Sequence, residues 1–243
     1  RIKNWYPREE RGETGINVVG RGHVVCHNRV SHFWDAISTS NAGGVQASWA
    51  TDAHPPQMAI DICHNDCAEL LDDGIEADHA LHNIRVFENR VVNAHVGLSA
   101  QPHLGGPLYF IRNEIYNVTA MPLKLHNSPS GLVIVNNTCI SAGQAFQSTP
   151  PEWKNALLRN NLFLGAKGYA METGSNDRRT SLDYNGYRKT GDAEGRFLKW
   201  SGDGGKTWTR SPTLADFTKA TGHETHGLMV DFDIFLKAAP PVE

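Results

Sequence analysis

The chain has 243 residues, with 26 acidic and 23 basic side chains and a formal net charge of -3. Hydrophobic residues make up 40% and charged residues 20% of it, a composition typical of globular proteins and not of disordered ones. The slightly acidic balance argues against a dedicated nucleic-acid-binding protein, and no apolar run approaches the roughly 20 residues that span a bilayer. We therefore expect a globular protein whose partner is neither nucleic acid nor membrane.

An asparagine flanked by apolar residues recurs along the chain, as in VCHNRV around Asn28 and VFENRV around Asn89. The first interval, from Asn28 to Asn65, is 37 residues, which is one period plus 13. Every later interval is 24 residues, and the asparagines concerned are Asn65, Asn89, Asn113, Asn137, Asn161 and Asn185. A period this constant indicates a repeat architecture.

Each repeat contains short stretches in which apolar and polar residues alternate. In the unit around Asn89, Ile84 and Val86 precede the asparagine, whereas Val91 and Leu98 follow it. Alternation with period two predicts three short strands per repeat and not a pair of helices. Stacked three-stranded units form a parallel β-helix. Asparagine tolerates left-handed backbone angles at a turn, and asparagines stacked at the same turn can form a hydrogen-bonded ladder.

These repeats resemble those of right-handed parallel β-helix proteins of the pectate-lyase-like superfamily. The resemblance covers residues 15–190 and is carried by segments such as DDGIEADHALHNIRVFENRV (72–91) and SAQPHLGGPLYFIRNEIYN (99–117). It implies an all-β, right-handed parallel β-helix of about seven coils. It also favours a secreted or periplasmic location, and both ends of the chain suggest part of a longer family member. The superfamily holds lyases, hydrolases, epimerases and non-catalytic proteins, so it implies carbohydrate chemistry without fixing the reaction.

We expect the β-helix over residues 1–185, interrupted by an insertion near 38–57 that is rich in Gly, Ala, Ser and Pro. In β-helix enzymes such loops line the substrate groove, and the alternative is a plain surface insertion. Residues 186–243 leave the repeat and are expected to form a hairpin and a short helix that pack on the β-helix.

The tail carries two local signals. SGDGGKTW (201–208) matches the Asp-box of sialidase-like propellers, a structural hairpin whose aspartate binds the turn backbone. Ser211 followed by proline predicts the start of a helix, with Gly222 as its end.

Equal offsets from the asparagines predict which side chains share a face, because neighbouring strands of a sheet lie about 4.8 Å apart. One outer face collects polar residues from three successive coils: Glu76 and Asp78, Ser99 and Gln101, and Lys124 and His126. Asp72 and Asp73 enter this face from the side, and Arg85 and His103 follow nearby in sequence. The resemblance places the catalytic groove of pectate-lyase-like enzymes on this face.

The first functional interpretation is β-elimination on an acidic, uronate-containing polysaccharide. A cation would neutralise the uronate carboxylate, and Ca²⁺ prefers oxygen ligands. The candidate metal ligands are Asp72, Asp73, Glu76 and Asp78. Lys124 would be the base, with a pKa lowered by burial or crowding.

Other side chains of the face would complete this site. His126 would hold the carboxylate or donate a proton beside Lys124, with Asp73 as the third catalytic candidate. The candidate substrate-binding residues are Arg85, Ser99, Gln101 and His103. Two coils separate Lys124 from Glu76, about 10 Å on the strand spacing, which a sugar and an ion would bridge.

Two further functions fit the same residues. Asp72 and Asp73 resemble the double aspartate of β-helix polygalacturonases, and paired carboxylates can hydrolyse a glycosidic bond. The Arg-X-Lys motif that follows the histidine in that family is absent here. In a non-catalytic carbohydrate-binding or structural β-helix, DDGIEAD would instead be turn chemistry.

The chain has four cysteines: Cys26, Cys63, Cys67 and Cys139. They are too few for a disulfide scaffold of this size, and the Cys63–Cys67 spacing has no second pair to complete a zinc site. We interpret them as buried free thiols.

Overall fold

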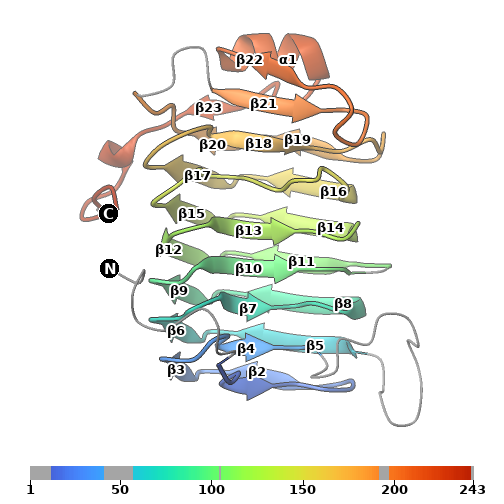
Figure 1. The fold of residues 1–243 in the computed structure, drawn as a ribbon, viewed down its shortest axis with the longest axis vertical. Coiled ribbons are helices and arrows are strands. Elements are labelled where there is room, and N and C mark those ends of the chain that lie inside the picture. The colour runs from blue at the N-terminus through green and yellow to red at the C-terminus, as the bar shows by residue number, and fades with distance from the viewer. Residues whose placement is uncertain (1–11, 41–56, 104, 192–196, 242–243) are drawn as a thin grey trace.

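The chain winds into a parallel β-helix whose coils stack along the long axis of the molecule (Figure 1). The structure is a computed structural model that describes residues 12–40, 57–103, 105–191 and 197–241. Among these residues, no helix is both long enough and apolar enough to cross a membrane.

Three parallel sheets form the faces of the β-helix. The first sheet has the order β1 (Ile16–Asn17), β4 (Ile37–Ser38), β7 (Asp73–Glu76), β10 (Val96–Ala100), β13 (Met121–Leu125). The second has the order β2 (Val24–Cys26), β5 (Gln57–Cys63), β8 (Ala80–Phe87), β11 (Leu108–Ile111), β14 (Ser130–Val135), β16 (Lys154–Arg159), β19 (Ser181–Asp183). The third has the order β3 (Arg29–Ser31), β6 (Asp66–Ala68), β9 (Arg90–Val92), β12 (Glu114–Val118), β15 (Thr138–Ser141), β17 (Leu162–Gly165), β20 (Gly186–Tyr187), β23 (Leu228–Met229).

Successive coils begin at β2, β5, β8, β11, β14, β16 and β19, and we number them from one to seven in this order. The sequence period is also the register of the sheets, since Ile84 of β8 lies opposite Leu108 of β11, which lies opposite Leu132 of β14. The parallel β-helix of about seven turns with a period of about 24 residues confirms the predicted fold class.

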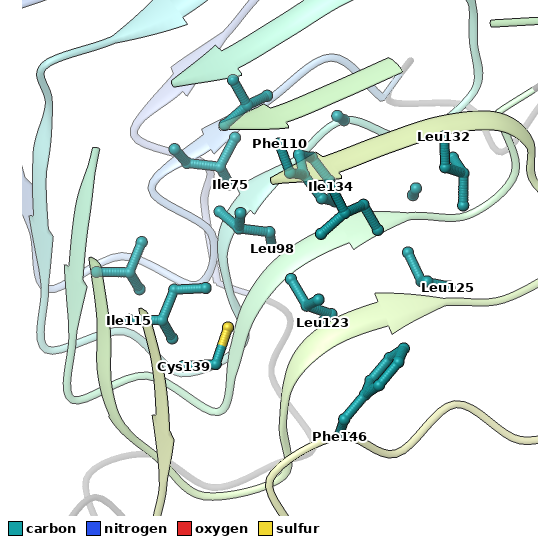
Figure 2. Packing of buried hydrophobic residues seen from close by; sticks show 14 of the residues in the cluster. Ile75, Leu98, Phe110, Ile115, Leu123, Leu125, Leu132, Ile134, Cys139 and Phe146 are labelled. Atoms are coloured by element: carbon teal, nitrogen blue, oxygen red, sulfur yellow. The ribbon is translucent and has the colours of Figure 1, made fainter. Parts of the chain in front are cut away.

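The apolar side chains of the alternating pattern fill the interior of the coils. Ile75, Leu98 and Leu123 are register partners on three successive strands and form one inward column. Figure 2 shows this column facing Phe110 and Ile134 across the interior. All five side chains are at most 1% exposed. Burial of one such side chain contributes about 2 kcal/mol, so the repeated columns supply most of the driving force for stacking.

The constant spacing of the asparagines along the chain produces a continuous ladder of buried amides. Asn113 Nδ2 donates to Asn137 Oδ1 at 3.0 Å, and Asn137 Nδ2 donates to Asn161 Oδ1 at 2.9 Å. Each amide also bonds the buried backbone, as Asn137 Nδ2 does with the Phe110 carbonyl at 2.8 Å. The ladder runs from Asn28 to Asn185 without a break.

The left-handed backbone angle at this turn falls one residue before the ladder. The φ angle is 58° at His27, 54° at Glu88 and 55° at Asn160, whereas the ladder asparagines lie outside the left-handed region. The expectation that the ladder asparagine itself adopts this angle is therefore wrong. The asparagine is required for its amide hydrogen bonds, and the preceding residue bears a conformational strain of about 1 kcal/mol.

The ladder ends on a carboxylate in place of an amide. Asn185 Nδ2 donates to Glu224 Oε1 at 2.7 Å, and the Tyr187 hydroxyl donates to the same oxygen at 2.8 Å. Burial raises the pKa of Glu224, although these hydrogen bonds oppose the shift. Glu224, which is 2% exposed, thus satisfies the last rung of the ladder.

The tail extends the stack. The strand β21 (Leu198–Ser201) lies parallel to β18 (Met171–Gly174) and antiparallel to β22 (Thr209–Ser211). Asp203 Oδ1 accepts a hydrogen bond from the Thr207 backbone at 2.9 Å, so the hairpin predicted from the Asp-box is confirmed. β23 also joins the third sheet beside β20.

The helix of the tail, α1 (Leu214–Thr221), begins later than the sequence predicts. Its N-cap is Thr213, whose hydroxyl accepts a hydrogen bond from the Asp216 backbone at 3.1 Å. The expected start at Ser211 is wrong because Ser211 is the last residue of β22. Gly222, with φ of 75°, ends the helix as predicted, and a short 3-10 helix follows at Phe232–Ile234.

We predict that Asn137→Ala lowers the free energy of unfolding by about 3 kcal/mol. The change removes the Oδ1 acceptor of the Asn113 backbone and side chain and leaves the Phe110 carbonyl without its amide donor. Urea denaturation measures the difference. The matched control is Asn136→Gly, because Asn136 is exposed and has a φ of 58° that glycine adopts freely. Equal stability of the two variants would contradict the role given to the ladder.

Candidate functional site

Polar side chains gather on the outer face of the first sheet. Ser38, Glu76, Ser99 and Lys124 are register partners on β4, β7, β10 and β13. The alignment of coils from the sequence therefore places these four residues in one row, as expected. They lie on the opposite side of the strands from the inward column of Ile75 and its partners, and Ser38 and Ser99 are at most 1% exposed.

A glycine at the start of β7 brings Asp73 onto the same outer face as Glu76. A Cβ atom on Gly74 would collide with the buried side chain of Val91 and with the carbonyl of Gly97. Gly74 and Ile75 thus both face the core at this corner. The side chains of Asp73 and Glu76 therefore lie on the opposite side of the strand. Only a residue without a side chain fits this corner.

Lys124 and Asp73 form an ion pair across the face. Lys124 Nζ lies 2.5 Å from Asp73 Oδ2, and the two side chains are 14% and 1% exposed. Because β10 lies between β7 and β13, the long lysine side chain spans a whole coil. The lysine side chain thus bridges the separation of two coils between β13 and β7 that the sequence alignment implied.

Three carboxyl groups meet beside this ion pair, and we call Asp35, Asp72 and Asp73 the acidic triad. One oxygen of each lies within 4.8 Å of the others. Asp35 Oδ1 accepts a hydrogen bond from the Asp73 backbone at 3.0 Å, and Asp72 Oδ2 accepts one from Trp34 Nε1 at 3.2 Å. Asp73 Oδ1 is buried and has no hydrogen-bond partner.

Sequence reasoning missed Asp35, although a signal for this residue was present. Ile37 of β4 and Ile75 of β7 are register partners. Asp35 and Asp73 each precede that isoleucine by two residues, so they occupy one column on neighbouring coils. Extending the column one coil toward the N-terminus would have added Asp35 to the candidate metal ligands.

The other two expected metal ligands, Glu76 and Asp78, are engaged by serines. The Ser38 hydroxyl donates to Glu76 Oε2 at 2.5 Å, and the Ser99 hydroxyl donates to Asp78 Oδ1 at 2.7 Å. Asp78 is 2% exposed. The carboxyl oxygens that converge tightly enough to hold one ion are those of the acidic triad, which contains Asp72 and Asp73 of the expected set.

Five carboxyl groups surround a single ammonium group in this cluster. Burial raises the pKa of Asp35 to about 7, with a further contribution from the Glu76 carboxylate. Burial also raises the pKa of Asp73 to about 8, against the opposing effect of Lys124, and it raises the pKa of Asp78. The cluster therefore retains protons near neutral pH, or it binds a cation in their place.

The expected lowering of the Lys124 pKa is wrong. Burial by itself lowers the pKa, but the carboxylates of Asp73 and Asp78 raise it by more, so the pKa lies above its usual value. Lys124 is thus an ammonium group and has no free electron pair with which to accept a proton.

Two histidines of the expected site are neutral. Burial and the charge of Lys124 lower the pKa of His126, and its buried Nε2 atom has no hydrogen-bond partner. His103 is completely buried, and burial lowers its pKa to about 4. Both ring nitrogens of His103 are also without partners. Gln101 lies half-buried just beyond the end of β10.

Arg85 is not brought together with the rest of the expected site. It lies on β8 of the second sheet, where its guanidinium group pairs with Asp61 of β5 at 2.5 Å. Arg85 therefore lies on a different face of the β-helix from Lys124, and the two residues would not contact the same substrate site. The pocket lined by Gly105, Gly131, Leu157 and Arg179 also lies over the second sheet and contains no residue of the acidic triad.

The polar row continues beyond Lys124 into the tail. The backbone of Gln147 forms an isolated parallel β-bridge with that of Glu172 on β18. Glu172 is in turn the register partner of Lys199 on β21. Lys199 Nζ lies 2.5 Å from Glu172 Oε1 and 4.5 Å from the centre of the Trp208 ring. From β7 to β21 the row crosses five strand spacings, about 24 Å. An elongated ligand would fit along this row better than a compact one.

No family model matches the chain, and comparisons with curated proteins and with solved structures find no match.

We predict that the metal-free protein loses stability as the pH rises through the titration of Asp35. The carboxyl binds its proton more tightly in the folded state, where its pKa is about 7, than in the unfolded state, where it is 3.8. The contribution of this proton to the free energy of unfolding is therefore complete below pH 3.8. It decreases by a few kcal/mol as the pH rises to about 7.

Asp35→Asn should flatten this dependence in urea denaturation at a series of pH values with a chelator present. Asp66→Asn is the control, because the Asp66 carboxylate is an exposed group paired with Arg90 on the third sheet. A pH dependence that is the same in wild type and in Asp35→Asn would show that Asp35 does not hold the proton.

Proposed function

We propose that this chain is a carbohydrate-active enzyme that binds an extended polysaccharide along the outer face of the first sheet and cleaves it at the acidic triad. The observation that carries the proposal is the position of the triad. Three mutually close carboxyl groups lie at one end of a polar row that runs the length of the stacked coils. The half-buried Lys124 and Gln147 side chains of this row can bond sugar hydroxyls, and the indole ring of Trp34 offers a surface for stacking.

Acid–base catalysis by carboxyl groups is the chemistry that these side chains support best. Asp35, with its pKa of about 7, would be the general acid that protonates the oxygen of the leaving sugar. Asp72, half-buried and held by Trp34, would be the carboxylate that acts as base or nucleophile. Asp73 is too deeply buried to reach a sugar, so it would be a positioning residue that Lys124 keeps in place.

β-Elimination on a uronate polysaccharide is the second candidate, and His126 favours it. A neutral imidazole beside the Lys124 ammonium could accept the α-proton while the ammonium pairs with the uronate carboxylate. In this scheme Lys124 supplies charge and His126 is the base. The surrounding carboxylates would repel an acidic polymer, so this reaction would also require a bound cation.

The activity is tested by incubation with neutral and uronate polysaccharides, followed by assay of new reducing ends and of the ultraviolet absorbance of unsaturated uronates. Hydrolysis predicts reducing ends without the absorbance, whereas β-elimination predicts both. We expect Asp35→Asn and Asp72→Asn to lower the rate at least about 100-fold. Asp61→Asn, on the second sheet, is the matched control and should retain the rate. No product with any substrate would contradict an enzymatic function and favour a binding module.

For the second candidate, β-elimination, we propose that the acidic triad binds Ca²⁺, because a carboxyl group that ligates the ion cannot also be the general acid of hydrolysis. Converging carboxyl oxygens suit this ion. The buried Asp73 Oδ1 has no hydrogen-bond partner, and a bound cation would supply the contact that this oxygen lacks. A bound cation would offset the excess of carboxylates and could order both substrate and protein at the triad.

Calcium binding predicts a rise in the melting temperature of about 5 °C or more at saturating Ca²⁺ and pH 7.5, measured by differential scanning fluorimetry. Asp72→Asn should abolish the rise because it removes an accessible ligand. Asp66→Asn should leave it intact. A rise of equal size in Asp72→Asn would place the ion elsewhere on the molecule.

A further inference from the structure

Two of the four cysteines lie side by side on neighbouring coils. Cys26 at the end of β2 and Cys63 at the end of β5 are register partners in the second sheet. Cys67 and Cys139, in contrast, are completely buried in the hydrophobic core. All four cysteines are free thiols, as expected, and the expectation that they are buried is wrong only for Cys26, which is half-buried.

The backbone holds the Cys26 and Cys63 side chains at a separation that a disulfide can span. In-register strands are about 4.8 Å apart, which is within the range of Cα distances across disulfides. The following residues, His27 and His64, show that side chains stack across these two coils, since their rings lie 4.9 Å apart and nearly parallel. After burial, the proximity of the Cys26 thiol is the next cause that raises the pKa of the Cys63 thiol.

The two thiols differ in their access to solvent. Cys26 is half-buried, whereas Cys63 is 7% exposed. A dissolved oxidant would therefore reach Cys26 first, and Cys63 is placed to react only with its neighbour. This is the arrangement of an attacking and a resolving cysteine.

We propose that Cys26 and Cys63 are a modification site at which a low-molecular-weight disulfide oxidant forms an intramolecular disulfide between the first and second coils. The Cys26 thiolate attacks one sulfur of oxidised glutathione, which forms a mixed disulfide and releases one glutathione thiolate. The Cys63 sulfur then attacks the Cys26 sulfur and releases the second glutathione. The two protein thiols lose two electrons, oxidised glutathione gains them, and both thiol protons pass to the released glutathione.

The disulfide would fasten a strand at the end of its sheet. Within the described residues, β2 pairs with β5 alone in the second sheet, so one edge of β2 has no neighbouring strand. The segment between the two cysteines contains Trp34, Asp35 and Ser38, which contribute to the acidic triad and its surroundings. Closing this loop restricts the unfolded chain and stabilises the folded one. The bond itself is expected whether or not the proposed activity is correct.

The test incubates the whole chain with oxidised glutathione, alkylates the remaining thiols, and maps the peptides without reduction. We expect a peptide linked through Cys26 and Cys63, with Cys67 and Cys139 alkylated only after unfolding. We also expect the melting temperature to rise by roughly 5 °C or more on oxidation. The rise should vanish in Cys26→Ser and persist in Cys67→Ser, which removes a buried thiol without a cysteine partner in register.

A stable glutathione adduct on Cys26 without the Cys26–Cys63 peptide would overturn the proposal, because it would show that Cys63 cannot resolve it. An unmodified pair of thiols under conditions that oxidise a solvent-exposed cysteine peptide would overturn it as well. A linked peptide without any change in melting temperature would retain the site and refute only its stabilising effect.

Discussion

The fixed register of the coils is the constraint on which the rest of the structure depends. Each asparagine of the ladder bonds the next amide and also the backbone of the previous coil, so a slip of one residue would leave several buried polar groups unpaired at once. The apolar columns alone would tolerate small shifts, because one branched side chain replaces another at little cost. The ladder removes that freedom. It converts equal spacing in sequence into equal position in space, which is why residues from distant segments form one row on the first sheet.

The candidate site departs from the pattern that stabilises the fold. On the second and third sheets, several charges of the described residues are paired across coils, as Arg85 is with Asp61 and Arg90 with Asp66. At the acidic triad, carboxyl groups outnumber the one ammonium, and Asp73 is buried with an unpartnered oxygen. Such an arrangement is expensive for the folded state unless a proton, a cation or a substrate compensates it. Local electrostatic imbalance within an otherwise balanced repeat is the physical reason for assigning function there.

Much of the fold could be predicted from the sequence because the period is written directly in the asparagines. The row of Glu76, Ser99 and Lys124 followed from the same alignment. Three-dimensional details escaped it for physical reasons. The contact of Lys124 with Asp73 depends on the reach of a side chain, and its raised pKa depends on how many carboxylates are close. Arg85 is near the site in sequence but on another face, because a turn intervenes between β7 and β8. Asp35 was overlooked although its column contained the information.

We propose that a polysaccharide chain lies along the outer face of the first sheet with its cleaved bond at the acidic triad. A crystal structure of Asp35→Asn soaked with a long oligosaccharide tests it most directly, since the variant should bind without cleaving. We expect sugar density that follows the row from the triad past Lys124 toward Lys199, with a ring against Trp34. Density on the second or third sheet, with the first sheet bare, would contradict it.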